Sequence, residues 1–338
     1  MLAGEIVKIL HVMAGLGETS GVANVARRFA RVQSERGDEV RLLAPACKWN
    51  PVYFDFAFAM RDWRQARDAD EIWVHCSWTF PVWFSAWVAK RFGKRLVVVP
   101  EASFDPRRLH NASDWKKRLV TPLDRWVLRQ ADEVLALCTD EVGWIRAFEP
   151  SARVRFTRVP TFCGNVPVQG VAAEALRCAN RPLHVLFLGR AADPLKGLAY
   201  LEQAVRALNE RLSLLGKSES RGIELRVVSN AVGAEKEAVW NWCDVLCLPT
   251  LSDNFGLVVA EALERGKPVI TTDGAPAWKN EPRTDAHGRT RLVYLEGYRD
   301  GADAQRVELL KRALGLFLED AARGAGGTVR REARGAER

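Results

Sequence analysis

Short apolar runs alternate with segments of helical periodicity along most of the chain. Residues 183–188 and 245–248 lack the polar alternation of half-exposed strands, so each run fits a strand buried on both faces of a parallel sheet. Two such series occur, and a segment with scattered Gly and Pro at residues 161–182 separates them. The sequence therefore predicts an α/β protein with two Rossmann-like lobes, whose parallel sheets face a central cleft.

The predicted boundaries follow from this alternation. An N-terminal lobe is expected at residues 1–160, a linker at 161–182 and a second lobe at 183–303. A helix with apolar residues at helical spacing is predicted at residues 304–322. The basic tail, residues 323–338, is rich in Gly and Arg and is predicted to be disordered.

The stretch of residues 243–278 carries the clearest arrangement of polar groups. It is predicted to run as strand, polar loop, helix, strand and polar loop. Ser252, Asp253 and Asn254 are N-cap residue types at the point where the helix must begin. Asp253 and Glu261 lie eight residues apart, so their carboxylates fall on the same general face of that helix. Polar and acidic groups therefore gather at the carboxyl ends of strands, where open α/β sheets bind ligands.

A glycine-rich loop follows the first predicted strand, residues 6–13. Gly15, Gly17 and Gly21 precede a predicted helix, whose N-terminus is a natural site for phosphate or sugar groups. The same spacing resembles a dinucleotide fingerprint, so an NAD(P)-dependent Rossmann oxidoreductase is an alternative. Such enzymes usually carry a carboxylate at the end of the second strand, whereas residues 40–45 contain none. The glycine pattern alone is weak evidence, and a plain tight turn is the other interpretation.

Other polar residues lie in or beside predicted strands. His75 falls in the predicted strand at residues 71–76, close to its carboxyl end. There it would contact a sugar or a phosphate, or else serve as a hydrogen-bonded core histidine. Cys243 and Cys247 lie in or beside an apolar strand, which favours buried thiols over a metal pair.

Composition narrows the classes of partner and compartment. The net charge of +8 favours an acidic or phosphorylated partner, but no zinc-finger, RNP or helix-turn-helix signature appears, so nucleic acid is not expected. Seven Cys without scaffold-like spacing indicate reduced thiols in a cytoplasmic protein. The longest apolar stretch, residues 80–89, is far shorter than the ~20 residues that span a bilayer. Nine of the twelve Trp precede residue 150, which fits a peripheral membrane surface, although core packing explains most of them equally well.

Several motifs of the second lobe occur together. They are Gly189-Arg190, Lys196-Gly197-Leu198, the run from Leu248 to Leu263 and the run from Gly266 to Pro276. In the first lobe, Ser20-Gly21-Val22 and His75-x-x-Trp78 add weaker motifs. This set resembles the retaining GT-B glycosyltransferases of family GT4 over most of residues 1–320. A proline-led loop after residue 99 and Lys116-Lys117 are also similar to members that build lipopolysaccharide, capsule or exopolysaccharide.

The resemblance implies a nucleotide-diphosphate sugar donor on the second lobe and a glycan or lipid-linked acceptor on the first. Arg190 and Lys196 would clamp the diphosphate and neutralise the leaving group, so neither a metal ion nor a further cofactor is expected. Glu261 would bind the ribose hydroxyls and Asp253 the donor sugar. The departing phosphate would take the acceptor's proton, with retention of configuration. The other site residues implied are His75 as a catalytic residue and Gly17, Gly21, Asn254, Phe255, Gly256 and Leu257 as donor contacts.

The chain departs from the family pattern at two acidic positions. Asp253 stands where Glu is usual, so its contact with the sugar would differ or pass through water, and it also fits a simple N-cap. Glu101 stands where related sequences often carry a basic residue, which leaves the acceptor-side roles open. A non-catalytic protein that binds a nucleotide-sugar through a degenerate site is therefore an alternative to the enzyme.

Overall fold

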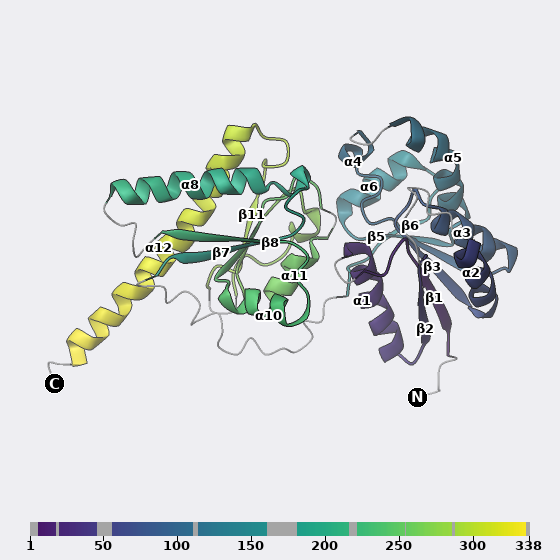
Figure 1. Ribbon diagram of the computed structural model, residues 1–338, viewed down its shortest axis with the longest axis horizontal. Helices are drawn as coiled ribbons and strands as arrows, with labels where there is room; N and C mark the ends of the chain where they lie inside the picture. Colours follow the sequence, from purple (N-terminus) through teal and green to yellow (C-terminus); the bar gives the residue numbers. More distant parts are fainter. Residues whose placement is uncertain are drawn as a thin grey trace. The chain divides into compact units, whose positions relative to one another are not determined.

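The computed structural model describes residues 6–17, 20–45, 56–110, 114–160, 181–215, 222–253, 255–285 and 288–335. The chain divides into two compact units, Met1–Thr161 and Phe162–Arg338, each built on a parallel sheet that helices cover (Figure 1). The two Rossmann-like lobes of the predicted α/β fold are therefore confirmed. The linker predicted at residues 161–182 lies outside the described residues, except for Arg181 and Pro182.

The first unit has a six-stranded parallel sheet in the order β2-β1-β3-β4-β5-β6. Its strands are β1 (Lys8–Val12), β2 (Glu39–Leu43), β3 (Glu71–His75), β4 (Arg95–Val99), β5 (Glu133–Ala136) and β6 (Val154–Phe156). Its helices are α1 (Gly21–Glu35), α2 (Phe56–Asp68), α3 (Phe80–Arg91), α4 (Pro106–His110), α5 (Asp114–Gln130) and α6 (Thr139–Phe148). The strand order reverses between β1 and β3, so the topological switch point lies at their carboxyl ends.

The apolar runs explain why this sheet is buried. In β4 every residue after Arg95 is fully buried, as expected for a central strand that helices cover on both faces. Leu10, Ile72 and Val98 share one apolar core with residues of α3 and α5. This core holds the carboxyl ends of β1, β3 and β4 next to one another, which positions the polar residues that follow them.

The second unit has a five-stranded parallel sheet in the order β11-β10-β9-β7-β8. Its strands are β7 (Leu183–Leu188), β8 (Ile223–Val228), β9 (Val245–Leu248), β10 (Val269–Thr272) and β11 (Leu292–Leu295). Its helices are α8 (Leu198–Leu214), α10 (Gly233–Trp242), α11 (Leu257–Glu264) and α12 (Asp303–Gly335), with short 3-10 turns η1 (Pro194–Lys196) and η2 (Pro276–Trp278). Here the switch point lies between β7 and β9.

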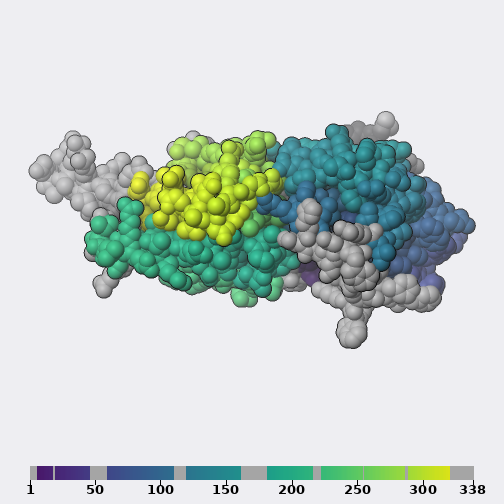
Figure 2. All heavy atoms as spheres, turned by 90° about the horizontal axis from the view of Figure 1, so that it is seen from above, coloured from purple at the N-terminus to yellow at the C-terminus, as the bar shows by residue number. Residues whose placement is uncertain are grey.

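Two helices bury one face of this second sheet. Leu201 of α8 packs with Leu310, Leu314 and Phe317 of α12 in the same core as Phe187 of β7. Figure 2 shows the two helices lying side by side on the surface of the unit. On the other side of the sheet lie α10 and α11 (Figure 1). None of the helices in the described parts of the chain is long and apolar enough to cross a membrane.

Two features differ from the sequence predictions. The tail predicted as disordered from residue 323 continues α12 as far as Gly335, because Ala and Arg, which favour helix, outnumber the glycines there. Helix α11 begins after Gly256, which is its N-cap residue, with a φ of 64°, in place of the expected polar types at residues 252–254. Residues 279–300, whose pattern predicts no element, include the edge strand β11.

Candidate active site

Lys196 lies at the switch point of the second unit, at the end of η1 after β7. Its Nζ lies 2.5 Å from Oδ2 of Asp253, which follows the neighbouring strand β9. The side chains of Lys196 and Asp253 are only 11% and 20% exposed, so the pair is largely shielded from water. The two residues that were predicted to act on the diphosphate and on the sugar are thus in direct contact.

Glycine at position 197 makes this placement of Lys196 sterically feasible. Gly197 has a φ of 71°, and a Cβ there would lie 1.9 Å from the carbonyl oxygen of Pro249. The loop is also tied to the end of β9, because the Leu251 amide donates to the Leu195 carbonyl oxygen at 2.7 Å. Backbone contacts between the two loops therefore bring Lys196 to Asp253.

Asp253 is fixed on both its backbone and its side chain. Its amide donates to the Gly274 carbonyl oxygen at 2.7 Å, and its Oδ1 accepts from the Gly256 amide at 3.1 Å. A Cβ at Gly274 would lie 2.0 Å from the Thr250 carbonyl oxygen, so that loop also needs glycine. One carboxylate oxygen thus holds the backbone of Gly256, the N-cap residue of α11, while the other pairs with Lys196; Asp253 supports the start of the helix without being its N-cap.

Glu261 forms another partly shielded ion pair in this unit. It lies on α11, and Nζ of Lys236 on α10 approaches its two carboxylate oxygens to 2.9 and 2.8 Å. The Glu261 and Lys236 side chains are 16% and 24% exposed. The sequence analysis did not predict Lys236. This residue lies in the first turn of α10, the helix that follows β8, and β8 is the neighbour of β7. That position is a signal that could have identified it.

The other predicted donor contacts surround these pairs. Arg190 follows β7 directly; its side chain is 66% exposed and pairs with Asp193 at 2.8 Å. Phe255 packs against Trp278, whose indole nitrogen donates to the Phe255 carbonyl oxygen. Leu257 is the first residue of α11. Asn254 lies outside the described residues.

In the first unit, the glycine loop leads from β1 into α1. Gly17 accepts a hydrogen bond from the amide of Ser20, which caps α1 by accepting from the Ala23 amide at 3.3 Å. A Cβ at Gly21 would meet no atom within 4 Å. Nothing within the described part of the unit therefore requires glycine at position 21. The space beside this residue, at the first turn of α1, is empty of other atoms of the described unit.

His75 is fully buried, and both of its ring nitrogens have partners. Its Nε2 lies 2.9 Å from Nδ1 of His11, and its Nδ1 lies 3.0 Å from Oε1 of Glu101. Nε2 of His11 lies 2.8 Å from Oε1 of Gln33, so four side chains form one chain. Burial lowers the pKa of His11 to about 4 and lowers the pKa of His75 well below its usual value, to which the neighbouring His11 adds. Both rings are therefore neutral at physiological pH.

The loops that follow β3 and β4 hold unusual backbone conformations. Five non-glycine residues in the described ranges have positive φ, and four of them lie in these two loops: Cys76, Trp78, Glu101 and Ala102. Such conformations are strained and persist only where the surroundings impose them, commonly at functional sites. Glu141 supports this region by accepting hydrogen bonds from the Ala102 and Leu137 amides at 2.6 and 2.7 Å.

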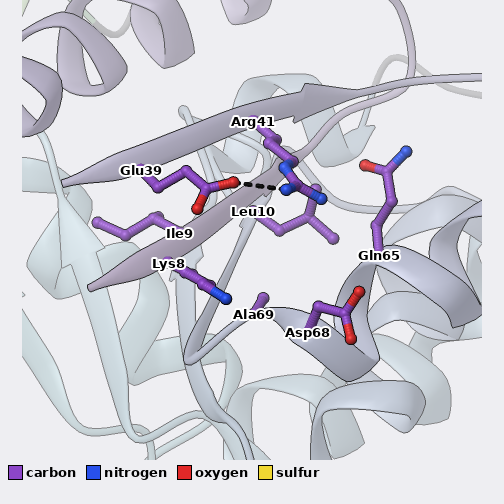
Figure 3. Close-up of a pocket in the computed structure, with 8 residues that line it drawn as sticks. All are labelled: Lys8, Ile9, Leu10, Glu39, Arg41, Gln65, Asp68 and Ala69. Atoms are coloured by element: carbon purple, nitrogen blue, oxygen red, sulfur yellow. Dashed lines mark hydrogen bonds and ion pairs between the residues drawn. The ribbon is translucent and has the colours of Figure 1, made fainter. Parts of the chain in front are cut away.

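A small pocket lies at the opposite edge of the same sheet (Figure 3). It is lined by Lys8, Ile9, Leu10, Glu39, Arg41, Gln65, Asp68 and Ala69. Lys8 and Glu39 begin β1 and β2, so the pocket lies at the amino ends of these strands. Because ligands of open α/β sheets bind at the carboxyl ends, this pocket is not the candidate site.

Models of protein families match both units of the chain. A model of a glycosyl transferase 4-like domain matches residues 44–161, and one of glycosyl transferases group 1 matches residues 182–303. Together they cover more than two thirds of the chain.

Two curated relatives match shorter stretches. The phosphatidyl-myo-inositol mannosyltransferase of Mycobacterium leprae is 30% identical over 104 residues, which is 26% of this chain and 28% of the relative. The D-inositol 3-phosphate glycosyltransferase of Pseudarthrobacter chlorophenolicus is 34% identical over 144 residues, 36% of this chain and 33% of the relative. The matched stretch thus spans a third or less of either relative's length.

Solved structures share the fold over nearly the whole chain. Anabaena Alr3699/HepE, in complex with UDP and glucose, superposes with a TM-score of 0.59 at 14% identity and covers 95% of this chain and 94% of its own. WaaG, a glycosyltransferase involved in lipopolysaccharide biosynthesis, gives a TM-score of 0.56 at 14% identity, covering 94% and 95%. At such low identity these similarities establish the arrangement of strands and helices.

Proposed function

Because this chain belongs to the GT4-type glycosyltransferases, with their two-lobed GT-B fold, we propose that it transfers a sugar from a nucleotide-diphosphate sugar to a glycan or lipid-linked acceptor. The observation that carries this proposal is the shielded contact between Lys196 and Asp253 at the switch point of the second unit. A cation and a carboxylate that meet at this point suit a ligand with both phosphate and hydroxyl groups.

Lys196 supplies the positive charge that the leaving group needs. When the donor bond breaks, negative charge develops on the diphosphate, and a preorganised cation in a shielded site stabilises it far more than water would. Arg190 adds a second cation from the same strand end. Its exposed pair with Asp193 contributes at most about 1 kcal/mol, so the guanidinium exchanges that partner for a phosphate at little cost.

Glu261 and Lys236 form the ribose end of the proposed donor site. A carboxylate accepts hydrogen bonds from two adjacent hydroxyls, which suits the 2′- and 3′-hydroxyls of a ribose. Lys236 donates a hydrogen bond to Oε1 of Glu261 and also lies 2.8 Å from Oε2, so it fixes the orientation of the carboxylate. Lys236 is therefore a positioning residue for Glu261 in this proposal.

The acceptor hydroxyl attacks from the side of the departing diphosphate in the proposed reaction. The C–O bond to the diphosphate breaks, the bond to the acceptor oxygen forms, and the phosphate takes the acceptor's proton, so that configuration is retained. The two cations neutralise the leaving group, and the reaction is proposed to need no metal ion.

We also propose a biosynthetic role for this transfer. Two similar proteins are a mannosyltransferase that acts on a phosphatidyl-inositol and an enzyme of lipopolysaccharide biosynthesis. By analogy, the acceptor is proposed to be an intermediate of a cell-surface polysaccharide, met at the cytoplasmic side of a membrane. The basic charge of the chain suits such a peripheral contact.

A donor panel tests this function directly. The purified full chain is incubated with UDP-, GDP- and ADP-sugars, with and without methyl and octyl glycosides, and release of the nucleoside diphosphate is measured. We expect release from one donor, faster with an acceptor, and a product with the anomeric configuration of the donor. Donor binding without any release would support the non-catalytic alternative, and nicotinamide binding to the first unit would support the oxidoreductase.

A further inference from the structure

The chain of four buried side chains in the first unit ends at Glu101. Gln33, His11, His75 and Glu101 come from α1, β1, β3 and the loop after β4, and contacts of 2.8, 2.9 and 3.0 Å join them in that order. Both nitrogens of His75 are used within this chain, so its ring has no nitrogen left for a substrate. Glu101 is the last of these four side chains and lies at the carboxyl edge of the sheet, where its side chain is 7% exposed.

Counting the protons along these hydrogen-bonded side chains shows why Glu101, at their end, matters. Each neutral histidine has one N–H, so the two rings supply two donors for three hydrogen bonds. The third donor comes from one of the ends. In one state Glu101 is a protonated acid, and every bond is donated toward Gln33. In the other state the Gln33 amide nitrogen donates, and every bond is donated toward a Glu101 carboxylate.

The orientation of the Gln33 amide favours the first of these two states. The amide oxygen of Gln33 faces Nε2 of His11, so His11 donates from Nε2 and accepts at Nδ1. His75 then donates from Nε2 to His11, and its Nδ1 accepts the proton of Glu101. Burial raises the pKa of Glu101 well above its usual value; Cys76 and Glu141 raise it further, and Arg108 opposes them.

The backbone of the loop that carries Glu101 also has an unusual conformation. Glu101 and Ala102 have consecutive positive φ values of 55° and 58°, a conformation that disfavours any side chain beyond glycine. Glu141, itself fully buried, holds the strained turn through the Ala102 amide at 2.6 Å. The fold therefore maintains a strained loop that places the buried carboxyl group of Glu101 next to His75. A loop that only connected two elements would not need this strain.

We propose that Glu101 binds the acceptor in the first unit as a neutral carboxylic acid, with its second oxygen accepting a hydrogen bond from an acceptor hydroxyl. Gln33, His11 and His75 are positioning residues, because they act on the acceptor only through Glu101. A neutral acid orients a hydroxyl without placing a negative charge near an anionic substrate. This inference rests on the proposed function, because it names the acceptor-side group of the same reaction.

The first test reads the histidine tautomers directly. The chain has five histidines, so selective 15N-histidine labelling gives a simple NMR spectrum. His11→Asn and His75→Asn variants assign the two buried rings. We expect both to be neutral, with the proton on Nε2 and an unprotonated Nδ1, and to remain so in Glu101→Gln, whose amide still donates to His75. Protons on Nδ1 of both rings, or a cationic His75, would overturn the proposal.

The second test separates acceptor binding from donor chemistry. Loss of one neutral hydrogen bond corresponds to about a three- to ten-fold effect, so Glu101→Ala should raise the KM for octyl glycosides by that factor. Glu101→Gln should restore part of this loss, because its amide donates and accepts as the neutral acid does. Donor hydrolysis without acceptor should change less than twofold in either variant. Glu39→Gln, an exposed carboxylate on β2 of the same sheet, is the matched control and should leave all of these values unchanged.

The outcomes distinguish this inference from the proposed function. An unchanged glycoside KM in Glu101→Ala, with normal donor hydrolysis, would overturn the role of Glu101 and leave the glycosyltransferase intact. If no donor releases its nucleoside diphosphate in the wild-type chain, the proposed function fails, and the acceptor role fails with it.

Discussion

The ammonium group of Lys196 lies 2.5 Å from a carboxylate oxygen of Asp253, although 57 positions separate the two residues. The contact joins the loops that follow the adjacent strands β7 and β9. An ion pair so shielded from water is costly unless both partners have further bonds or a function. We interpret it as the resting state of a donor site in which a diphosphate competes for the lysine.

Lys196→Ala should reduce kcat/KM for the donor by about ten- to a hundred-fold, because a charged hydrogen bond contributes roughly 1.5–3 kcal/mol. Nucleoside diphosphate release at varied donor concentration measures the effect. Lys311→Ala is the control, since Lys311 pairs with Glu308 on the exposed surface of α12 in the same unit. Wild-type turnover in Lys196→Ala would remove the diphosphate role from this residue.

Asp253→Asn should separate the structural role of Asp253, which holds the Gly256 backbone, from its role in transfer. The amide oxygen can still accept from the Gly256 amide, so the free energy of unfolding should change by less than about 1 kcal/mol. Sugar transfer should fall at least ten-fold, because the negative charge that orients Lys196 is gone. Urea unfolding and donor turnover, measured on the same preparation, check both halves. A large loss of stability with normal turnover would instead leave Asp253 with a structural role alone.

Lys236 and Glu261 should behave as a coupled unit in nucleotide binding. Calorimetric titration with the nucleoside diphosphate is expected to show weaker binding in Lys236→Met and in Glu261→Gln, and the double variant should lose less than the sum. The exposed pair of Glu237 and Arg265, which joins the same two helices, provides the control variant Glu237→Gln. Strictly additive losses would show that Lys236 does not act through Glu261.

Two glycines should respond to substitution in opposite ways. Gly197→Ala places a methyl group 1.9 Å from the Pro249 carbonyl oxygen at a positive φ, so it should lower the melting temperature and displace Lys196. Gly21→Ala meets no atom within 4 Å, so stability should be maintained while substrate turnover falls. Gly143→Ala, which is equally unhindered but lies in α6, is the control for turnover. Normal turnover in Gly21→Ala would remove the glycine loop from the proposed site.

The buried Asp62 should make stability depend on pH. It accepts a hydrogen bond from Ser85 at 2.7 Å, and burial raises its pKa to about 7. Between roughly pH 4 and 7 the native state keeps a proton that the unfolded chain has released, so the free energy of unfolding falls as pH rises through this window.

Asp62→Asn removes that titration, and its amide oxygen still accepts from Ser85. The stability of the variant relative to the wild type should therefore increase from pH 4 to pH 7, by up to about 1.36 kcal/mol for each unit of pKa shift. Chemical unfolding across this range measures the difference. Asp68→Asn, at the exposed end of the same helix, should show no such trend; a parallel dependence in both variants would contradict the assignment to Asp62.

The sequence by itself determined the architecture. Apolar runs such as residues 245–248 fit strands buried on both faces of a parallel sheet, and the helical segments between them complete two α/β units. Because strand ends and helix starts are local features, the sequence also placed Lys196, Asp253 and Glu261 at or near the binding edge of the second sheet. Local periodicity was less informative for α12, where helix propensity outweighs several glycines.

Only the tertiary structure decided which of these side chains meet. Lys236 pairs with Glu261, and His75 is enclosed by His11 and Glu101, because parallel strand order brings together residues that lie 25 to 64 positions apart. No local pattern encodes such contacts, since they depend on which strands are neighbours and on how their loops pack. The protonation of the histidine chain likewise follows from burial, which a sequence specifies only through the complete fold.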